Sequence, residues 1–358
     1  MKKETYLKYI EQTIENMNKS TKKELLKRYE QDGLTIKPDT QEKVSDETAI
    51  KINYNDIDGT IIRCINNNNN NKAIENYEKY QYTKSYKYSV LFKTTTPSLI
   101  KEMLEKIPTY VYEDETTKLF DNLAKPQKIE YDEYTIINFN KKYEAVHPQT
   151  TKELLLQYPI VIIIYKNTNI IEFRFDTIKH LFIENNGQLF YVNLIDEIMN
   201  YFYEKHHLEL EPLNLEFMRE CSTSDKNIIL LSQYMNFKTG SKAQLTVGNN
   251  EEYILPLIGE LKNIMKELKT ELDNNIKIKD ALEQFIYEKE ETTDYPWIEV
   301  LFKDLEGVKT RDNHVKFIFN YMNKNYCLIN YYYNEMLVGM ERMNYVTNYI
   351  RENINKNK

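Results

Sequence analysis

Two apolar runs separated by a short polar turn constrain the fold of this chain more than any other feature. Residues 160–165 read IVIIIY, residues 166–169 read KNTN and residues 170–175 read IIEFRF. Strand-forming runs joined by a short turn that contains asparagine are typical of a β-hairpin. The second run alternates in polarity, so Glu172 and Arg174 are expected on one side of the strand. In a half-buried sheet, that side would face solvent.

Other segments repeat this pairing or show a helical period. Residues 315–332 contain two apolar runs around a polar turn, and residues 178–192 contain two shorter runs around an Asn-Asn-Gly turn. Both patterns predict hairpins. Residues 228–236, 251–272 and 336–350 instead space their apolar side chains by three and four, which predicts helices.

Paired strands joined by short turns, without regular strand–helix–strand repeats, predict an α+β fold in which antiparallel β-hairpins pack against helices. The length of 358 residues exceeds the roughly 250 to 300 over which one core usually grows, which favours two domains. We place their boundary near residue 150. Residues 1–150 would form an α+β domain with a helical start and a flexible Asn-rich loop. Residues 151–358 would form a second α+β domain with the central hairpin and a closing ββα unit.

The cysteines and the apolar runs bear on where the protein acts. Cys64, Cys221 and Cys327 are odd in number and far apart, which argues against a disulfide framework and favours a reducing compartment. The N-terminal segment KKETYLKYIEQ lacks the apolar core of a signal peptide. The most apolar run falls far short of the roughly 20 residues that span a bilayer. These features predict a cytoplasmic protein with no membrane partner.

Residues 77–93 (YEKYQYTKSYKYSVLFK) carry five tyrosines and four lysines against one glutamate, in a chain of net charge −7. Aromatic faces that stack on bases and cations that follow phosphates are the components of a single-stranded nucleic-acid surface. An edge strand protected from aggregation by lysines explains the same pattern. The nucleic-acid-binding residues predicted by the first interpretation are Lys79, Tyr80, Tyr82, Lys84, Tyr86, Lys87, Tyr88 and Lys93.

The charged residues of the central hairpin offer a catalytic alternative. Glu172 and Asp176 alternate along a strand, and carboxylates projecting from a strand hold Mg²⁺ in metal-dependent nucleases. Asp132 or Glu184 from neighbouring strands would complete the ligand set. Arg174 lies between the two acids, where such an enzyme would need a group that can lose a proton near neutral pH.

The sequence contains no recognisable metal-ligand cluster, phosphate loop or nucleophile arrangement, so it predicts no cofactor and no bound metal. It favours a cytoplasmic, non-enzymatic binding protein that assembles with nucleic acid or another protein. The alternative is a divergent metal-dependent phosphodiesterase or nuclease centred on Glu172 and Asp176. A composition dominated by Asn, Lys, Ile and Tyr is what AT-rich coding sequence produces, and it suggests a phage, plasmid or antiviral-defence origin.

Overall fold

The computed structural model describes most of the chain, with several short gaps. The described residues are 3–38, 49–67, 71–112, 119–166, 168–183, 187–237, 240–246, 258–291, 293–303, 313–332 and 339–354. The chain divides into two compact units. Unit 1 consists of residues 1–213 and 333–345, and unit 2 of residues 214–332 and 346–358.

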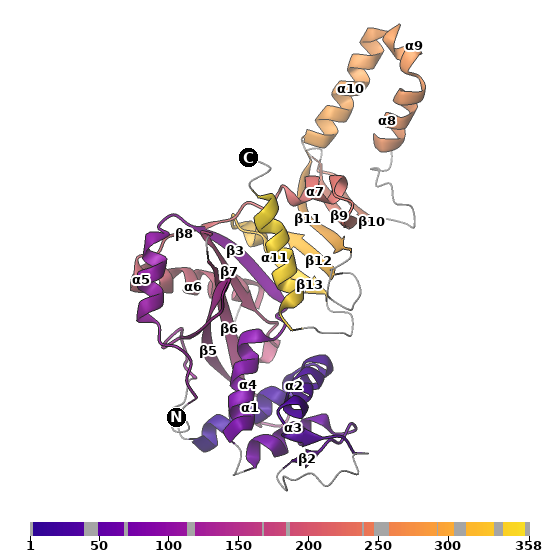
Figure 1. Ribbon diagram of the computed structural model, residues 1–358. Coiled ribbons are helices and arrows are strands. Elements are labelled where there is room, and N and C mark those ends of the chain that lie inside the picture. The colour runs from indigo at the N-terminus through magenta and orange to yellow at the C-terminus, as the bar shows by residue number, and fades with distance from the viewer. Residues whose placement is uncertain are drawn as a thin grey trace. The chain divides into compact units, whose positions relative to one another are not determined.

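Unit 1 begins with a helical layer (Figure 1). Its helices are α1 (Lys3–Asn16), α2 (Lys19–Gln31), α3 (Ile57–Asn66) and α4 (Asn71–Thr83). Two short parallel strands, β1 (Thr35–Ile36) and β2 (Ile50–Lys51), lie between α2 and α3 in sequence. Buried tyrosine rings hold this layer together while their hydroxyl groups find polar partners. The Tyr29 hydroxyl donates to the carbonyl of Ala73 at 2.8 Å, and the Tyr6 hydroxyl donates to Glu78 at 2.7 Å.

The sheet of unit 1 is antiparallel, with neighbouring strands in the order β3-β7-β6-β5-β4 and with β8 paired to β3. Its strands are β3 (Tyr88–Thr94), β4 (Gln127–Glu130), β5 (Tyr134–Val146), β6 (Glu153–Tyr165), β7 (Ile170–Phe175) and β8 (Leu210–Pro212). The central hairpin is confirmed, because β6 and β7 pair in antiparallel register from Ile164 opposite Ile171 to Val161 opposite Arg174. The helices α5 (Ser98–Lys106) and α6 (Phe190–His206) complete the regular helices of this part of unit 1.

Unit 2 contains a second antiparallel set of strands, in the order β10-β9-β11-β12-β13. They are β9 (Ile228–Asn236), β10 (Lys242–Thr246), β11 (Asp294–Phe302), β12 (Asn313–Ile318) and β13 (Leu328–Tyr332). The predicted hairpin at 315–332 is confirmed by the pairing of β12 with β13. The helices assigned to this part of the chain are α7 (Met218–Ser224), α8 (Ile258–Glu267), α9 (Lys269–Asp273) and α10 (Ile276–Glu291), followed by the C-terminal α11 (Glu341–Asn353).

The predicted α+β class is therefore correct, while two local predictions are wrong. Residues 228–236 form strand β9 instead of a helix, because β10 and β11 pair with it on both sides. Residues 180–182 and 187–189 form 3₁₀ turns that lead into α6 instead of a hairpin. Residue 150 lies in the turn between β5 and β6, which pair along their whole length. Where independently folding domains begin and end stays a prediction.

The structure also bears on the cysteines, on the apolar stripe near the C-terminus and on membrane-spanning helices. All three cysteines are free and buried. Met340, Met343 and Val346 of the C-terminal apolar stripe are buried, as core residues should be. Within the described residues, no helix combines the length and hydropathy needed to cross a bilayer.

Candidate functional site

The basic aromatic stretch 77–93 divides between the C-terminal half of α4 and strand β3. Tyr80, Tyr82 and Tyr86 are buried, at no more than 3% exposure. Tyr88 is partly buried, with its ring centroid 4.9 Å from that of Tyr191. In this conformation, the three buried rings offer no face on which a base could stack.

The four lysines of the same stretch have different surroundings. Lys79 is exposed and forms an ion pair with Glu75 at 2.7 Å, and Lys93 is exposed on β3. Lys84 is buried and forms an ion pair with Asp176. Lys87 is about half-buried, and burial lowers its pKa below that of an ordinary lysine. Nucleic-acid binding by this stretch stays a prediction, and among its lysines Lys79 and Lys93 are the exposed ones.

Glu172 and Arg174 lie inside the protein, so the prediction that they face solvent is wrong. β7 lies between β3 and β6, and all six of its residues are buried. Arg174 Nη2 lies 2.7 Å from Glu172 Oε2, and the Tyr165 hydroxyl donates to the same oxygen at 2.6 Å. A buried carboxylate needs such partners, because an uncompensated charge in the interior is strongly unfavourable. This contact ties Glu172 to a structural ion pair.

Asp176, the other predicted catalytic acid, follows β7 and has separate partners. It accepts a hydrogen bond from the backbone N–H of Lys87 at 3.0 Å and forms the ion pair with Lys84. In the part of the chain that the structure describes, no group of three or more His, Cys, Asp or Glu side chains could hold a metal ion. Asp132 belongs to no such group, and Glu184 lies outside the described residues.

The strongest candidate for a binding surface is a helical arm, defined here as α8, α9 and α10, residues 258–291. Figure 1 shows these helices as a hairpin. The turn between α9 and α10 is closed by an ion pair in which Lys279 Nζ lies 2.9 Å from Asp273 Oδ1. Of the arm's described side chains, Ile286 alone is classed as buried. The arm thus contributes very little to a protein core.

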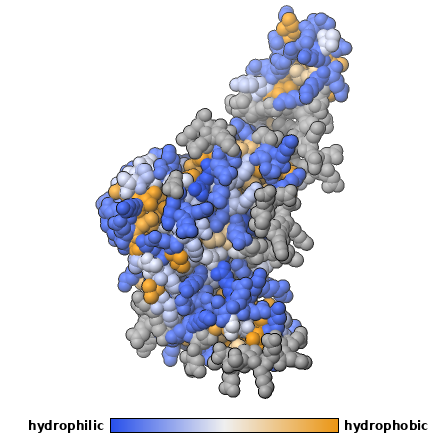
Figure 2. All heavy atoms as spheres, in the orientation of Figure 1, coloured by the Kyte–Doolittle hydropathy of each residue, from blue (hydrophilic) through white to orange (hydrophobic). Residues whose placement is uncertain are grey.

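Large apolar side chains are exposed along the arm, and they are visible as orange spheres among blue polar ones (Figure 2). The exposed fraction reaches 64% for Ile276 and 59% for Tyr287. The exposed apolar residues of the arm are Ile264, Leu268, Ile276, Ile278, Phe285 and Tyr287. Single exposed apolar residues are ordinary on protein surfaces, whereas larger apolar patches are typical of interaction sites, and this makes the arm a candidate for one.

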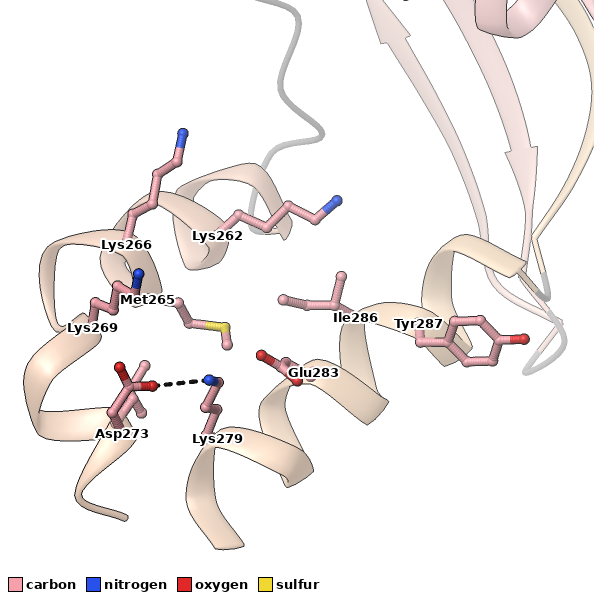
Figure 3. Close-up of a pocket in the computed structure, with 10 residues that line it drawn as sticks. Lys262, Met265, Lys266, Lys269, Asp273, Lys279, Glu283, Ile286 and Tyr287 are labelled. Atoms are coloured by element: carbon pink, nitrogen blue, oxygen red, sulfur yellow. Dashed lines mark hydrogen bonds and ion pairs between the residues drawn. The ribbon is translucent and has the colours of Figure 1, made fainter. Parts of the chain in front are cut away.

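A groove of about 490 Å³ runs between α8 and α10 (Figure 3). Met265 from α8 and Ile286 from α10 point toward one another across it. Leu272 adds to the apolar lining. The charged residues that line the groove are Lys262, Lys266, Lys269, Asp273, Lys279 and Glu283. The groove is therefore apolar at its centre and mainly basic on the α8 side.

The width of the apolar face of α10 is a sequence feature that could have identified this arm. Successive residues of a helix lie about 100° apart, so residues 276, 278, 282, 285, 286 and 287 of α10 spread over about 200° of its circumference. A surface helix that buries one face in its own protein needs a narrower apolar stripe. The excess apolar width predicts a second apolar contact for α10.

No protein-family model matches this chain, and neither does any curated protein sequence. Its function must therefore be inferred from its own geometry.

Proposed function

We propose that this protein is a non-enzymatic binding protein that joins an assembly through the helical arm. The partner is another protein, which inserts an amphipathic helix into the groove between α8 and α10. The exposed apolar surface of the arm is the observation that carries this proposal.

Helix geometry supports the choice of occupant. Short helices such as α8 and α9 are marginally stable in water unless an apolar face is covered. A partner helix in the groove would cover Met265 and Ile286 in the manner of helix-in-groove recognition. Covering each half-exposed side chain, such as Phe285 or Ile278, would add about 1 kcal/mol or more to binding.

The charges along the groove define the partner further. Lys262, Lys266 and Lys269 line the groove on the α8 side. A partner helix with acidic residues beside its apolar stripe would complement them, whereas a basic helix would be repelled. We place this assembly in the cytoplasm, in agreement with the three free thiols.

Site-specific photo-crosslinking tests this function. A photoreactive phenylalanine analogue at Phe285 should crosslink one protein in cells that produce this chain, through a helix with an apolar stripe and acidic flanks. The matched control places the same analogue at Leu181 of unit 1, which is exposed to a similar degree.

The purified partner should then bind the wild type and lose at least tenfold in affinity for Phe285→Ser with Ile278→Ser. Crosslinks that are identical at both positions, or binding that the double substitution leaves unchanged, would refute the proposal. A crosslink from Phe285 to nucleic acid instead of protein would also refute it.

A further inference from the structure

A second site lies in unit 1, where a polar cleft of about 240 Å³ opens beside the Lys84–Asp176 ion pair. The cleft is formed by the end of α1, the start of α2, the end of α4 with the segment that follows it, strand β6, and the residues that follow β7. The side chains that the argument uses are Asn18, Gln81, Lys84, Lys87 and Asp176.

The cleft carries more positive than negative charge. Lys84 and Lys87 line it, and Asp176 is its one acidic lining residue. Asp176 is engaged with the ammonium group of Lys84 and with the backbone N–H of Lys87. Glu24 is near Lys84 but does not line the cleft, and burial raises the pKa of its carboxyl group.

Gln81 provides an independent observation. Its side chain is 1% exposed and lines the cleft, and its Nε2 atom has no hydrogen-bond partner among the described residues. A buried amide N–H without an acceptor is unfavourable, and proteins rarely retain one without a reason. A ligand oxygen in the cleft would supply the acceptor.

The start of α2 adds a third source of positive potential. Asn18 caps this helix of 13 residues, and its side-chain oxygen accepts the Thr21 N–H at 2.8 Å. Asn18 and Thr21 both line the cleft, so the positive end of the helix dipole is directed toward it.

We propose that this cleft binds an oxyanion group, a phosphate or a carboxylate, carried by a small molecule. The Gln81 amide and the Lys87 ammonium group donate hydrogen bonds to its oxygens, and the N-terminus of α2 stabilises its charge. Asp176 holds Lys84 in place and excludes a second anion.

Equilibrium dialysis with labelled inorganic phosphate, and separately with labelled acetate, tests the site at constant ionic strength. We expect one of the two anions to bind saturably at one per chain. Gln81→Met and Lys87→Met each remove one donor at similar volume, and each should weaken binding at least tenfold. Lys93→Met is the matched control, because Lys93 is exposed on β3 and does not line the cleft.

Saturation by phosphate alone would identify a phosphorylated ligand, and saturation by acetate alone a carboxylate. If neither anion saturates the wild type, the proposal is overturned. The same holds if Lys93→Met weakens binding as much as Lys87→Met does. Thermal melting of each variant identifies loss of fold, and if Gln81→Met unfolds, Lys87→Met alone decides the outcome.

Discussion

Helices α4 and α10 both interleave lysine and glutamate with aromatic and aliphatic residues, as NKAIENYEKYQYT and IKIKDALEQFIYEKEE. In α4, Tyr77 and Tyr80 are completely buried, whereas in α10, Phe285 and Tyr287 are 47% and 59% exposed. The neighbours differ: α4 packs on α2, α3 and β5, while the main neighbour of α10 is α9.

Residue type alone therefore does not distinguish a core helix from an exposed one. The basic aromatic stretch looked like a binding surface, but most of its rings are core. The less conspicuous α10 retains the exposed apolar surface. Whether the apolar side chains of a helix are buried depends on how many other elements pack against it, and these elements are often distant in sequence.

Removing the buried helix α11 should destabilise the protein far more than removing the exposed arm. A chain that ends at residue 334 lacks α11, in which Met343, Val346 and Ile350 are completely buried. Each such side chain contributes about 1.5 to 3 kcal/mol, so the loss approaches the roughly 5 to 15 kcal/mol of a typical domain. We expect this chain to lose cooperative thermal melting.

The matched deletion replaces residues 258–291 with a short Gly/Ser linker and should leave cooperative melting in place. If the chain without α11 stays monodisperse and melts cooperatively, α11 is a peripheral element and its methionine stripe belongs to an interface. If the arm deletion unfolds the protein, the arm is part of the core.

Single aromatic truncations make the same comparison at residue level. Tyr80→Ala should lower the free energy of unfolding by about 3 to 5 kcal/mol, because it leaves a cavity beneath α4. Phe285→Ala should change it by about 0.5 kcal/mol or less in the absence of a partner, as surface substitutions do. Urea denaturation followed by circular dichroism measures both, and equal losses would contradict the contrast between the helices.

Charged pairs extend the comparison beyond aromatic residues. Glu172→Gln leaves Arg174 without its buried counter-ion and should destabilise the protein by about 3 kcal/mol or more. Asp273→Asn removes an exposed partner from Lys279 and should leave the urea midpoint nearly unchanged, because solvent screens an exposed ion pair. Urea midpoints that shift by the same amount in both variants would show that the Glu172 pair is not under structural constraint.

The salt dependence of single-stranded oligonucleotide binding tests what remains of the predicted nucleic-acid surface. If residues 77–93 bind single strands, affinity should fall steeply with salt. Lys79→Met with Lys93→Met should reduce the logarithmic salt slope by about 1.4, since each phosphate contact contributes about 0.7. Lys266→Met with Lys269→Met on the arm is the control and should leave the slope unchanged. If binding to DNA and RNA is absent or does not depend on salt, the hypothesis that residues 77–93 bind single-stranded nucleic acid is wrong.

We expect no nuclease activity from the wild-type protein with Mg²⁺ or Mn²⁺. Glu172 is held by Arg174 and Tyr165, and Asp176 by Lys84, so neither is arranged as a metal ligand. Gel assays on single- and double-stranded nucleic acids measure cleavage. Reproducible cleavage that is abolished by Glu172→Gln or Asp176→Asn, in a variant that still melts cooperatively, would place the protein in the alternative class.

Local pattern was sufficient to predict those parts of the fold whose partners are adjacent in sequence. The β6–β7 and β12–β13 hairpins are examples, because a short turn determines their pairing. Strand β9 was predicted as a helix, because its spacing of apolar residues fits both periods. Its extended structure is fixed by β10 on one side and by β11, which begins at Asp294 far away in sequence, on the other.

The candidate site residues were likewise predictable only as far as their local pattern allowed. The sequence identifies Glu172 and Arg174 as alternating along a strand, but it cannot show that both faces of β7 are covered. Whether the side chain of Phe285 is covered likewise depends on elements that the sequence does not place. The cleft beside Lys84 joins residues from α1, α2, α4 and β6, which no local pattern could bring together.

Unit 1 is built from two segments of the chain, residues 1–213 and 333–345, and this affects the order in which it can fold during synthesis. Ser85 Oγ donates to the carbonyl of Gly339, and the backbone N–H of Tyr86 lies 3.4 Å from Met343 Sδ. Both acceptors are translated after the intervening residues 214–338, which take roughly 6 to 25 seconds to add at about 5 to 20 residues per second. The segment between α4 and β3 therefore gains these contacts only after residues 214–338 have been translated, and a ribosome that stalls within residues 214–332 carries an incompletely folded unit 1.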